Sequence, residues 1–213
     1  MIQNLLKKIL PETQKKRNRR IPFNKLIILS AIVGILGGLL SSAYILVLKE
    51  ILHLVWDVGK PALYSILPVW LRSINPIWII TALGGLFVGI SLKVLGQCGE
   101  ISAVVNNINM KKGSIDIRQT PSMTITSLIS ISFGGSAGPE APLVQIIGSL
   151  GSRIGEKLRL HGDIIRTLTF SGMGAALGAL FSAPLGGALF ALEIPHRRGL
   201  EYYEALIPSL VAA

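Results

Sequence analysis

Residues 134–145 read Gly-Gly-Ser-Ala-Gly-Pro-Glu-Ala-Pro-Leu-Val-Gln and form a Gly- and Pro-rich break between two long apolar segments. Inside a membrane every backbone polar group needs a partner, so such a break indicates broken helices that line a polar cavity or are buried in protein. Pro139 and Pro142 suit the first turn of a helix, where a missing N–H group costs nothing. We therefore predict that a helix begins near residue 140.

Glu140 is the one carboxylate of this stretch. It would lie at the positive end of the predicted helix, where free N–H groups form an anion site. The carboxylate and a free anion would then compete for the same donors, which is the property of a gate. The alternative is an ordinary solvated loop carboxylate, but an acidic residue between apolar membrane helices is functional by default.

The composition indicates a multi-spanning membrane protein, because half of the residues are apolar and only 15% are charged. The net charge is +10, but 7 of the 21 Lys and Arg residues lie within the first 20, beside the first apolar run. This favours an integral, multi-pass protein of the plasma (inner) membrane with a cytoplasmic N-terminus. The pattern needed for nucleic-acid binding is absent, so membrane lipid is an expected partner and nucleic acid is not.

The chain divides into a cytoplasmic amphipathic and polybasic segment, 1–25, and a membrane domain, 26–213. Small residues predict close helix contacts at Gly34, Gly37 and Gly38, and at Gly85 and Gly89. Residues 49–76 are predicted to be an external connection with a non-spanning piece. The predicted helices cover 26–48, 77–95, 121–133, 140–158 and 199–213, with two short helices inside 164–193 that are separated at 183–187. Cys98 is the only cysteine, which excludes an intrachain disulfide and a Cys-rich metal site, and no cofactor is expected.

Residues 138–146, Gly-Pro-Glu-Ala-Pro-Leu-Val-Gln-Ile, resemble the Gly-Lys/Arg-Glu-Gly-Pro…Val-Gln-Ile motif of the CLC chloride channels and chloride/proton antiporters. Residues 159–163, Arg-Leu-His-Gly-Asp, and residues 181–193, Phe-Ser-Ala-Pro-Leu-Gly-Gly-Ala-Leu-Phe-Ala-Leu-Glu, are also similar to motifs of this family. The resemblance implies an all-α membrane protein with broken and re-entrant helices, the first half of an inverted-repeat fold. It further implies transport of chloride or a similar anion, and a homodimer when complete.

The resemblance also implies which residues bind the anion. In the family a Gly-Ser-Gly-Ile-Pro helix start supplies a serine to the central chloride, and residues 98–102, Cys-Gly-Glu-Ile-Ser, align with it. The serine position is therefore a glycine here, and Pro139 replaces the family's basic residue beside the gate. The implied anion-binding positions are Gly99, Ile101, Ser102, Gly138, Pro139 and Ala141.

Glu193 aligns with the first residue of the family's Glu-Glu pair, and Ile194 aligns with the second, the internal proton acceptor of the antiporters. An aliphatic side chain cannot take up or release a proton. Passive conduction is therefore favoured over chloride/proton exchange, which stays the alternative. Glu193 could equally be an ordinary acid at a cytoplasmic helix end.

Only the motifs of the family's first half occur in the 213 residues, so we expect a fragment or truncated product whose missing second half is needed for a pore. A non-transporting fragment that requires a partner half is the rival hypothesis. A third alternative comes from residues 134–138, which fit the Gly-x-Ser-x-Gly pattern of hydrolases. The strand-turn-helix context of that pattern is missing, so we do not expect an enzyme.

Overall fold

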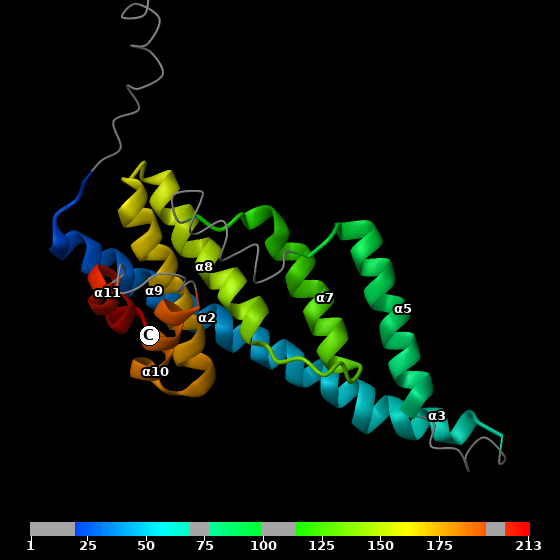
Figure 1. Ribbon diagram of the computed structural model, residues 1–213. Coiled ribbons are helices and arrows are strands. Elements are labelled where there is room, and N and C mark those ends of the chain that lie inside the picture. The colour runs from blue at the N-terminus through cyan, green and yellow to red at the C-terminus, as the bar shows by residue number, and fades with distance from the viewer. Residues whose placement is uncertain (1–19, 69–76, 99–113, 195–202) are drawn as a thin grey trace, which may run out of the picture.

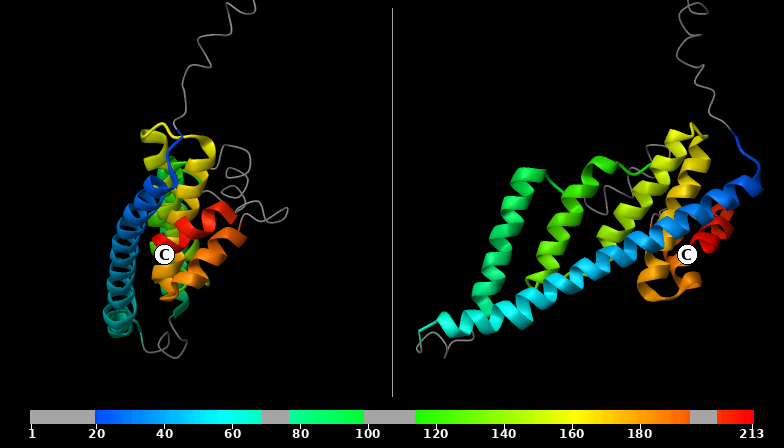
Figure 2. Two further views of the ribbon diagram at one scale, coloured as in Figure 1. Left: turned by 90° about the vertical axis from the view of Figure 1, so that its left-hand side faces the viewer. Right: turned by 180° about the vertical axis from the view of Figure 1, so that it is seen from behind.

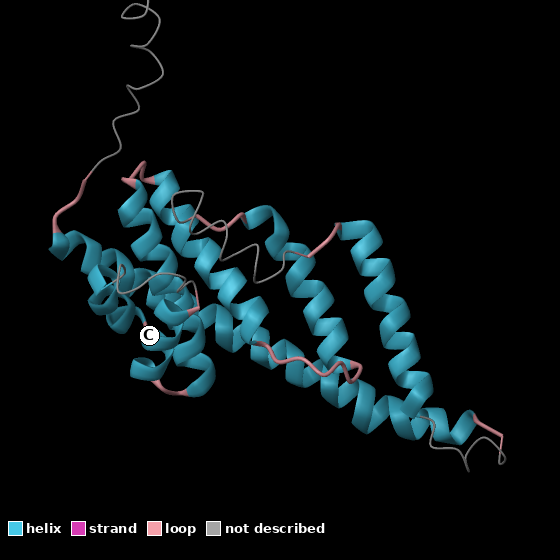
Figure 3. Ribbon diagram, in the orientation of Figure 1, coloured by secondary structure: helices cyan, strands magenta, loops and turns pink. Residues whose placement is uncertain are grey.

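The computed structural model describes residues 20–68, 77–98, 114–194 and 203–213. These residues form helices joined by turns and loops, without a strand, which confirms the all-α prediction (Figure 3). In chain order the elements are α2 (Phe23–His53), the π-helical turn η1 (Leu54–Gly59), α3 (Lys60–Ile66), α5 (Ile77–Leu95), the 3₁₀ turn η2 (Ile117–Gln119), α7 (Thr120–Ser132), α8 (Glu140–Lys157), α9 (Gly162–Phe181), α10 (Pro184–Glu193), the 3₁₀ turn η3 (Tyr203–Ala205) and α11 (Leu206–Ala212).

Helices α5, α7, α8 and α9 lie side by side, and α2 crosses them obliquely on one face (Figures 1 and 2). Among the described residues, three helical stretches are long and apolar enough to cross a membrane. They are Phe23–Ile66, Ile77–Leu95 and Gly162–Phe181, with mean hydropathies of 2.3, 1.9 and 1.4. This supports the prediction of an integral membrane protein. The shorter α7 and α10 are the broken helices expected from the sequence.

The first long helix differs from its prediction, because it begins at Phe23 and continues without a break to Ile66. The predicted end near residue 48 and the separate connection over 49–76 are therefore wrong in the described part. Pro61 has no N–H group to donate and would break a regular α-helix. The turn before it widens to a π-helix, in which the N–H of Lys60 donates to the carbonyl of Val55. This widened turn lets the helix pass the proline.

The break predicted at 183–187 is present, but α9 is longer than expected. Ser182 adopts a left-handed conformation with φ of 52°, and the N–H of Ala183 donates to the carbonyl of Gly178 at 3.1 Å. The chain then reverses into α10, whose second-turn glycine, Gly187, lies against the backbone of Gly178. With 20 residues, α9 can span a membrane by itself, so only α10 is a short helix.

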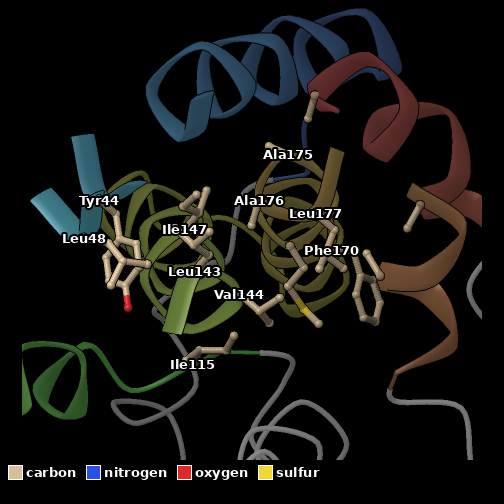
Figure 4. Close-up of a cluster of buried hydrophobic side chains, with 14 residues drawn as sticks. Tyr44, Leu48, Ile115, Leu143, Val144, Ile147, Phe170, Ala175, Ala176 and Leu177 are labelled. Atoms are coloured by element: carbon tan, nitrogen blue, oxygen red, sulfur yellow. The ribbon is translucent and has the colours of Figure 1, made fainter. Parts of the chain in front are cut away.

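The core lies between α8 and α9 (Figure 4). Leu143 and Ile147 on α8 and Leu177 on α9 are fully buried, and Tyr44 reaches the cluster from α2. Hydroxyl groups connect the helices across this interior. Ser30 and Ser171 join α2 to α9 at 3.1 Å, Tyr44 and Ser127 join α2 to α7 at 2.9 Å, and Ser91 and Thr126 join α5 to α7 at 2.8 Å.

The predicted small-residue contacts are confirmed for Gly34 and Gly37 of α2, and they are wrong for Gly38 of α2 and for α5. A Cβ atom at Gly34 would overlap Ala212 of α11, and one at Gly37 would overlap Ile147 of α8. Gly85 and Gly89, in contrast, have open space beside them. Helix α5 instead meets α7 through the face that carries Ile80, Gly84 and Ser91, with Gly84 against Phe133. The contact face is thus rotated by about one residue, or 100°.

The closest approach of α8 and α9 gives a first test. A Cβ atom at Gly172 would overlap the carbonyl oxygen of Ile147, which belongs to helix backbone and cannot move aside cheaply. We expect Gly172→Ala to lower the free energy of unfolding by about 1–3 kcal/mol, measured by thermal unfolding in detergent. The matched control is Gly85→Ala, where a methyl group meets nothing and higher helix propensity should preserve stability. Equal stability of both variants would contradict this packing.

Candidate anion-binding site

Helix α8 begins at Glu140, as the two prolines predict. Pro139 is its N-cap, and the first helical hydrogen bond runs from the N–H of Leu143 to the carbonyl of Pro139 at 3.1 Å. Pro142 has no N–H, so the donors left at the start of the helix are those of Glu140 and Ala141. Together with the helix dipole they make this end attractive to an anion.

The Glu140 side chain folds back over the preceding glycine. A Cβ atom at Gly138 would overlap the Glu140 carboxylate, so this position must be glycine for the side chain to lie there. Glu140 is half-buried and Gly138 is exposed. The carboxylate therefore lies beside Gly138, immediately before the first turn of α8. Gly138, Pro139, Glu140 and Ala141, which the sequence analysis named as site positions, are consecutive and lie at this helix start.

Trp56 anchors the loop before the site, residues 133–139. The indole Nε1 donates to the carbonyl of Ser132 at 2.8 Å, which satisfies a backbone acceptor at the end of α7. Gly134, with φ of +94°, packs against this indole and against Thr81 of α5. The loop also bonds to α7, because the N–H of Gly135 donates to the carbonyl of Ser130 at 2.7 Å.

Nothing in the sequence assigns Trp56 to this site, so its contact with the loop is a finding of the structure. It lies in the π-helical turn η1, and such turns are frequent at functional sites. The proline at position 61 and Gly59 were the available signals of an irregular turn. They could not show that the turn meets a loop 76 residues further along the chain.

Replacing this indole tests the anchor. We expect Trp56→Phe to remove one hydrogen bond, worth about 0.5–1.5 kcal/mol, and to increase amide hydrogen exchange in residues 133–137. The matched control is Trp78→Phe, whose side chain is 53% exposed at the start of α5. Exchange in the loop should be unchanged by the control. Unchanged exchange in Trp56→Phe would show that the loop does not depend on the indole.

Side chains of α8 form hydrogen bonds with the residues on either side of η2, in the segment that leads into α7. Gln145 is buried, and its Nε2 donates to the carbonyl of Asp116 at 3.1 Å. One turn further on, Ser149 and Thr120 join their hydroxyl groups at 3.1 Å. The predicted anion-binding positions Gly99, Ile101 and Ser102 lie outside the described residues. Just before them, Cys98 lies 3.5 Å from the Ser122 hydroxyl, as a packing residue would.

Glu193 and Ile194 lie at the end of α10, which packs on α9 and α11. The Glu193 side chain is exposed, whereas Ile194 is half-buried and packs against the core cluster around α8 and α9. Neighbouring positions thus place the carboxylate outside and the aliphatic side chain inside. This pattern suits an ordinary acid at a helix end.

Neither hydrolase chemistry nor a metal site is evident in the described part of the chain. Ser136 is exposed in the loop before α8, while His161 lies beyond the opposite end of that helix. The His161 Nδ1 atom lies 2.9 Å from Oδ2 of Asp163. Within the described ranges no three His, Cys, Asp or Glu side chains gather as metal ligands would.

Known proteins resemble this chain over most of its length. A family model described as "Voltage gated chloride channel" matches residues 84–213. A chloride/fluoride channel protein of Pseudomonas syringae pv. tomato is 28% identical over 191 residues, which are 89% of this chain and 38% of that protein. The H(+)/Cl(-) exchange transporter ClcA of Vibrio parahaemolyticus is 27% identical over 175 residues, 81% of this chain and 37% of that protein.

A solved structure supports the fold. The crystal structure of a CLC-type fluoride/proton antiporter superposes with a TM-score of 0.63 at 20% identity, covering 91% of this chain and 47% of that one. At this identity the likeness shows the fold alone. The chain spans about two fifths of the length of the curated relatives named above.

Proposed function

Because the chain belongs to the voltage-gated chloride channel (CLC) family, we propose that it forms part of a membrane protein that carries chloride or a similar small anion, with Glu140 as the gate. The observation that carries this proposal is the Glu140 carboxylate folded over the start of α8. An anion can bind the N–H groups of Glu140 and Ala141 only when that carboxylate moves aside. The gate thus works by competition between a fixed and a mobile negative charge.

Around the gate, Gly138, Pro139 and Ala141 are proposed to border the anion, because they surround the free end of α8. We propose Gly99, Ile101 and Ser102 as a second, inner position on the family resemblance alone. With Gly99 at the serine position, backbone N–H groups would supply the donors there. Pro139 offers neither a charge nor an N–H group, which should weaken anion attraction beside the gate.

We propose that the N-terminal segment, 1–25, lies in the cytoplasm and that 26–213 form the membrane domain. The starts of α2, α7 and α9 and the ends of α5 and α8 lie toward the same side of the molecule (Figure 1). Basic residues gather at these helix ends, as the positive-inside rule requires of the cytoplasmic side. They are Arg20, Lys25, Lys93, Arg118, Arg153, Lys157 and Arg159. The plasma (inner) membrane is the proposed location.

Passive conduction is favoured over exchange because Ile194 occupies the position of the antiporters' internal acid and packs into the core. Proton-coupled exchange is the second candidate, since relatives of this chain include H(+)/Cl(-) exchange transporters. Chloride and fluoride both merit testing as the anion. The first named relative is a chloride/fluoride channel protein, and the solved structure is of a fluoride/proton antiporter.

We propose that transport needs a second set of helices beside these 213 residues, and that the complete protein is a homodimer. The donors at the start of α8 can bind an anion in a dry cavity only if protein covers them from the other side. Gly138 and the loop residues before it are exposed, so the described residues do not provide that cover. The rival is that residues 1–213 are a non-transporting piece in any setting.

A reconstitution experiment separates these views. Residues 1–213 alone in liposomes should give no chloride or fluoride flux above that of empty liposomes. Circular dichroism of the same liposomes serves as the control that the protein is helical. Co-expression with a matching second half should restore flux. Robust flux from residues 1–213 alone would contradict the need for further helices, and no flux with any second half would favour the non-transporting piece.

A further inference from the structure

A groove of about 290 Å³ is lined by residues from the start of α2 and from the turn between α8 and α9, residues 158–161. Among the described residues, its wall is apolar except for one ammonium group. The lining residues are Ile21, Lys25, Ile28, Leu29, Leu158 and Leu160.

The bottom of the groove is formed by a buried side chain, and its opening is lined by exposed apolar side chains. Leu160 is 3% exposed and packs with Leu29 in the cluster that joins α2 to α9. Ile28 and Leu158, in contrast, are 59% and 45% exposed. A hydrocarbon chain can therefore lie along Ile28 and Leu158 without displacing the core.

Cations border this apolar channel. The Lys25 side chain is exposed in the groove, and the exposed Arg159 lies between the two lining leucines in the turn. Lys157 precedes that turn, and Arg20 precedes the lining residue Ile21. All four cations lie at the end of the molecule where α2 and α9 start and α8 ends, which on the proposed orientation is the depth of lipid headgroups.

The two carboxylates nearest along the chain offset at most two of these four positive charges. Glu156 lies 3.9 Å from Arg153, and Asp163 lies 2.9 Å from His161. An occupant of this groove thus meets apolar walls below and net positive charge above.

We propose that this groove is a binding site for an anionic phospholipid, with an acyl chain along Ile28 and Leu158 and the phosphate at Lys25 and Arg159. A zwitterionic lipid has the chain but lacks the net charge, and a free phosphate has the charge but not the chain. On the proposed orientation the site faces the cytoplasmic leaflet. Near anionic lipids, each Lys or Arg raises the affinity of a protein for the membrane by about a factor of 5.

The test uses the full chain in bilayer nanodiscs with a trace of phosphatidylglycerol that carries a photoreactive group on its acyl chain. Labelled peptides are identified by mass spectrometry. We expect labelling of the peptides that hold Ile28 and Leu158, about fivefold less labelling in Lys25→Gln, and full labelling in the control Lys49→Gln. Lys49 is an exposed cation on the same helix, outside the groove.

A second pair of variants tests the acyl channel. Ile28→Trp should fill the groove and lower labelling severalfold, while Ile35→Trp, at a residue 67% exposed on the same helix, should not. Soluble glycerol phosphate should fail to compete. Equal labelling by a photoreactive phosphatidylcholine, equal loss in both members of a pair, competition by glycerol phosphate, or labelling that falls in residues 1–19 instead would each overturn the proposal.

Discussion

Glu140→Gln and Glu140→Ala should raise passive anion flux about tenfold in a protein that contains this half and a second half. Both variants remove the negative charge that covers the start of α8, while the N–H groups of Glu140 and Ala141 remain. A charge at a helix terminus contributes up to about 2 kcal/mol, and 1.4 kcal/mol is a factor of ten. Flux is measured as chloride or fluoride efflux from liposomes, over a range of pH.

The matched control is Glu156→Gln, which removes an exposed carboxylate from the other end of the same helix. It should leave flux unchanged. We expect the pH response of the flux to fall in the two Glu140 variants, because both lack the carboxyl group of the proposed gate. Wild-type flux and an unchanged pH response in both Glu140 variants would show that Glu140 is not the gate.

Gly138→Ala tests the folded-back position of the carboxylate without removing it. A Cβ atom at residue 138 would occupy the space of the Glu140 carboxylate, and that end of a flexible side chain can move away at little cost. We expect Gly138→Ala to raise anion flux when Glu140 is present. In the double variant with Glu140→Ala, it should have no further effect on flux. Additive effects of the two substitutions would indicate that residue 138 acts independently of the gate.

The sequence predicted the parts of this site that depend on local chemistry. Two prolines and a glutamate mark the start of α8 because their backbone preferences hold in any surroundings. The same is true of Gly34 and Gly37, where only a missing side chain allows α2 to approach its neighbours. The break between α9 and α10 was predicted at 183–187 for the same reason, because Pro184 lies there.

Features that depend on distant residues could not be predicted. The rotation of α5 is set by Phe133, which packs against Gly84 and meets Phe87 edge to face at 5.7 Å. Because residues 84 and 85 are both glycine, the sequence alone is compatible with either face of α5 as the contact face. The first helix passes Pro61 through a π-helical turn that is stabilised by packing around Trp56. The hydrophobic periodicity of the sequence cannot predict such a contact between distant residues.

A chloride or fluoride gradient should drive no uphill proton movement through the complete protein. By the family resemblance, Ile194 aligns with the position at which the antiporters have an acid, and its half-buried side chain packs against the core. Glu193 is adjacent, but its side chain is exposed, and neighbouring helix positions point about 100° apart. Proton movement is measured with a pH electrode in lightly buffered liposomes while an anion gradient is applied.

Two substitutions identify the group responsible if protons do move. Glu193→Gln should leave anion flux unchanged in a passive channel, whereas loss of stoichiometric proton uptake in this variant would identify Glu193 as an internal relay. Ile194→Glu places a carboxyl group where the family's acid lies, at a cost of about 1–3 kcal/mol for burying a polar group, and should introduce some coupling. Stoichiometric proton uptake by the unmodified protein would overturn the channel assignment. Because the aliphatic side chain of Ile194 cannot carry a proton, the proton would then have to pass through Glu193 or water.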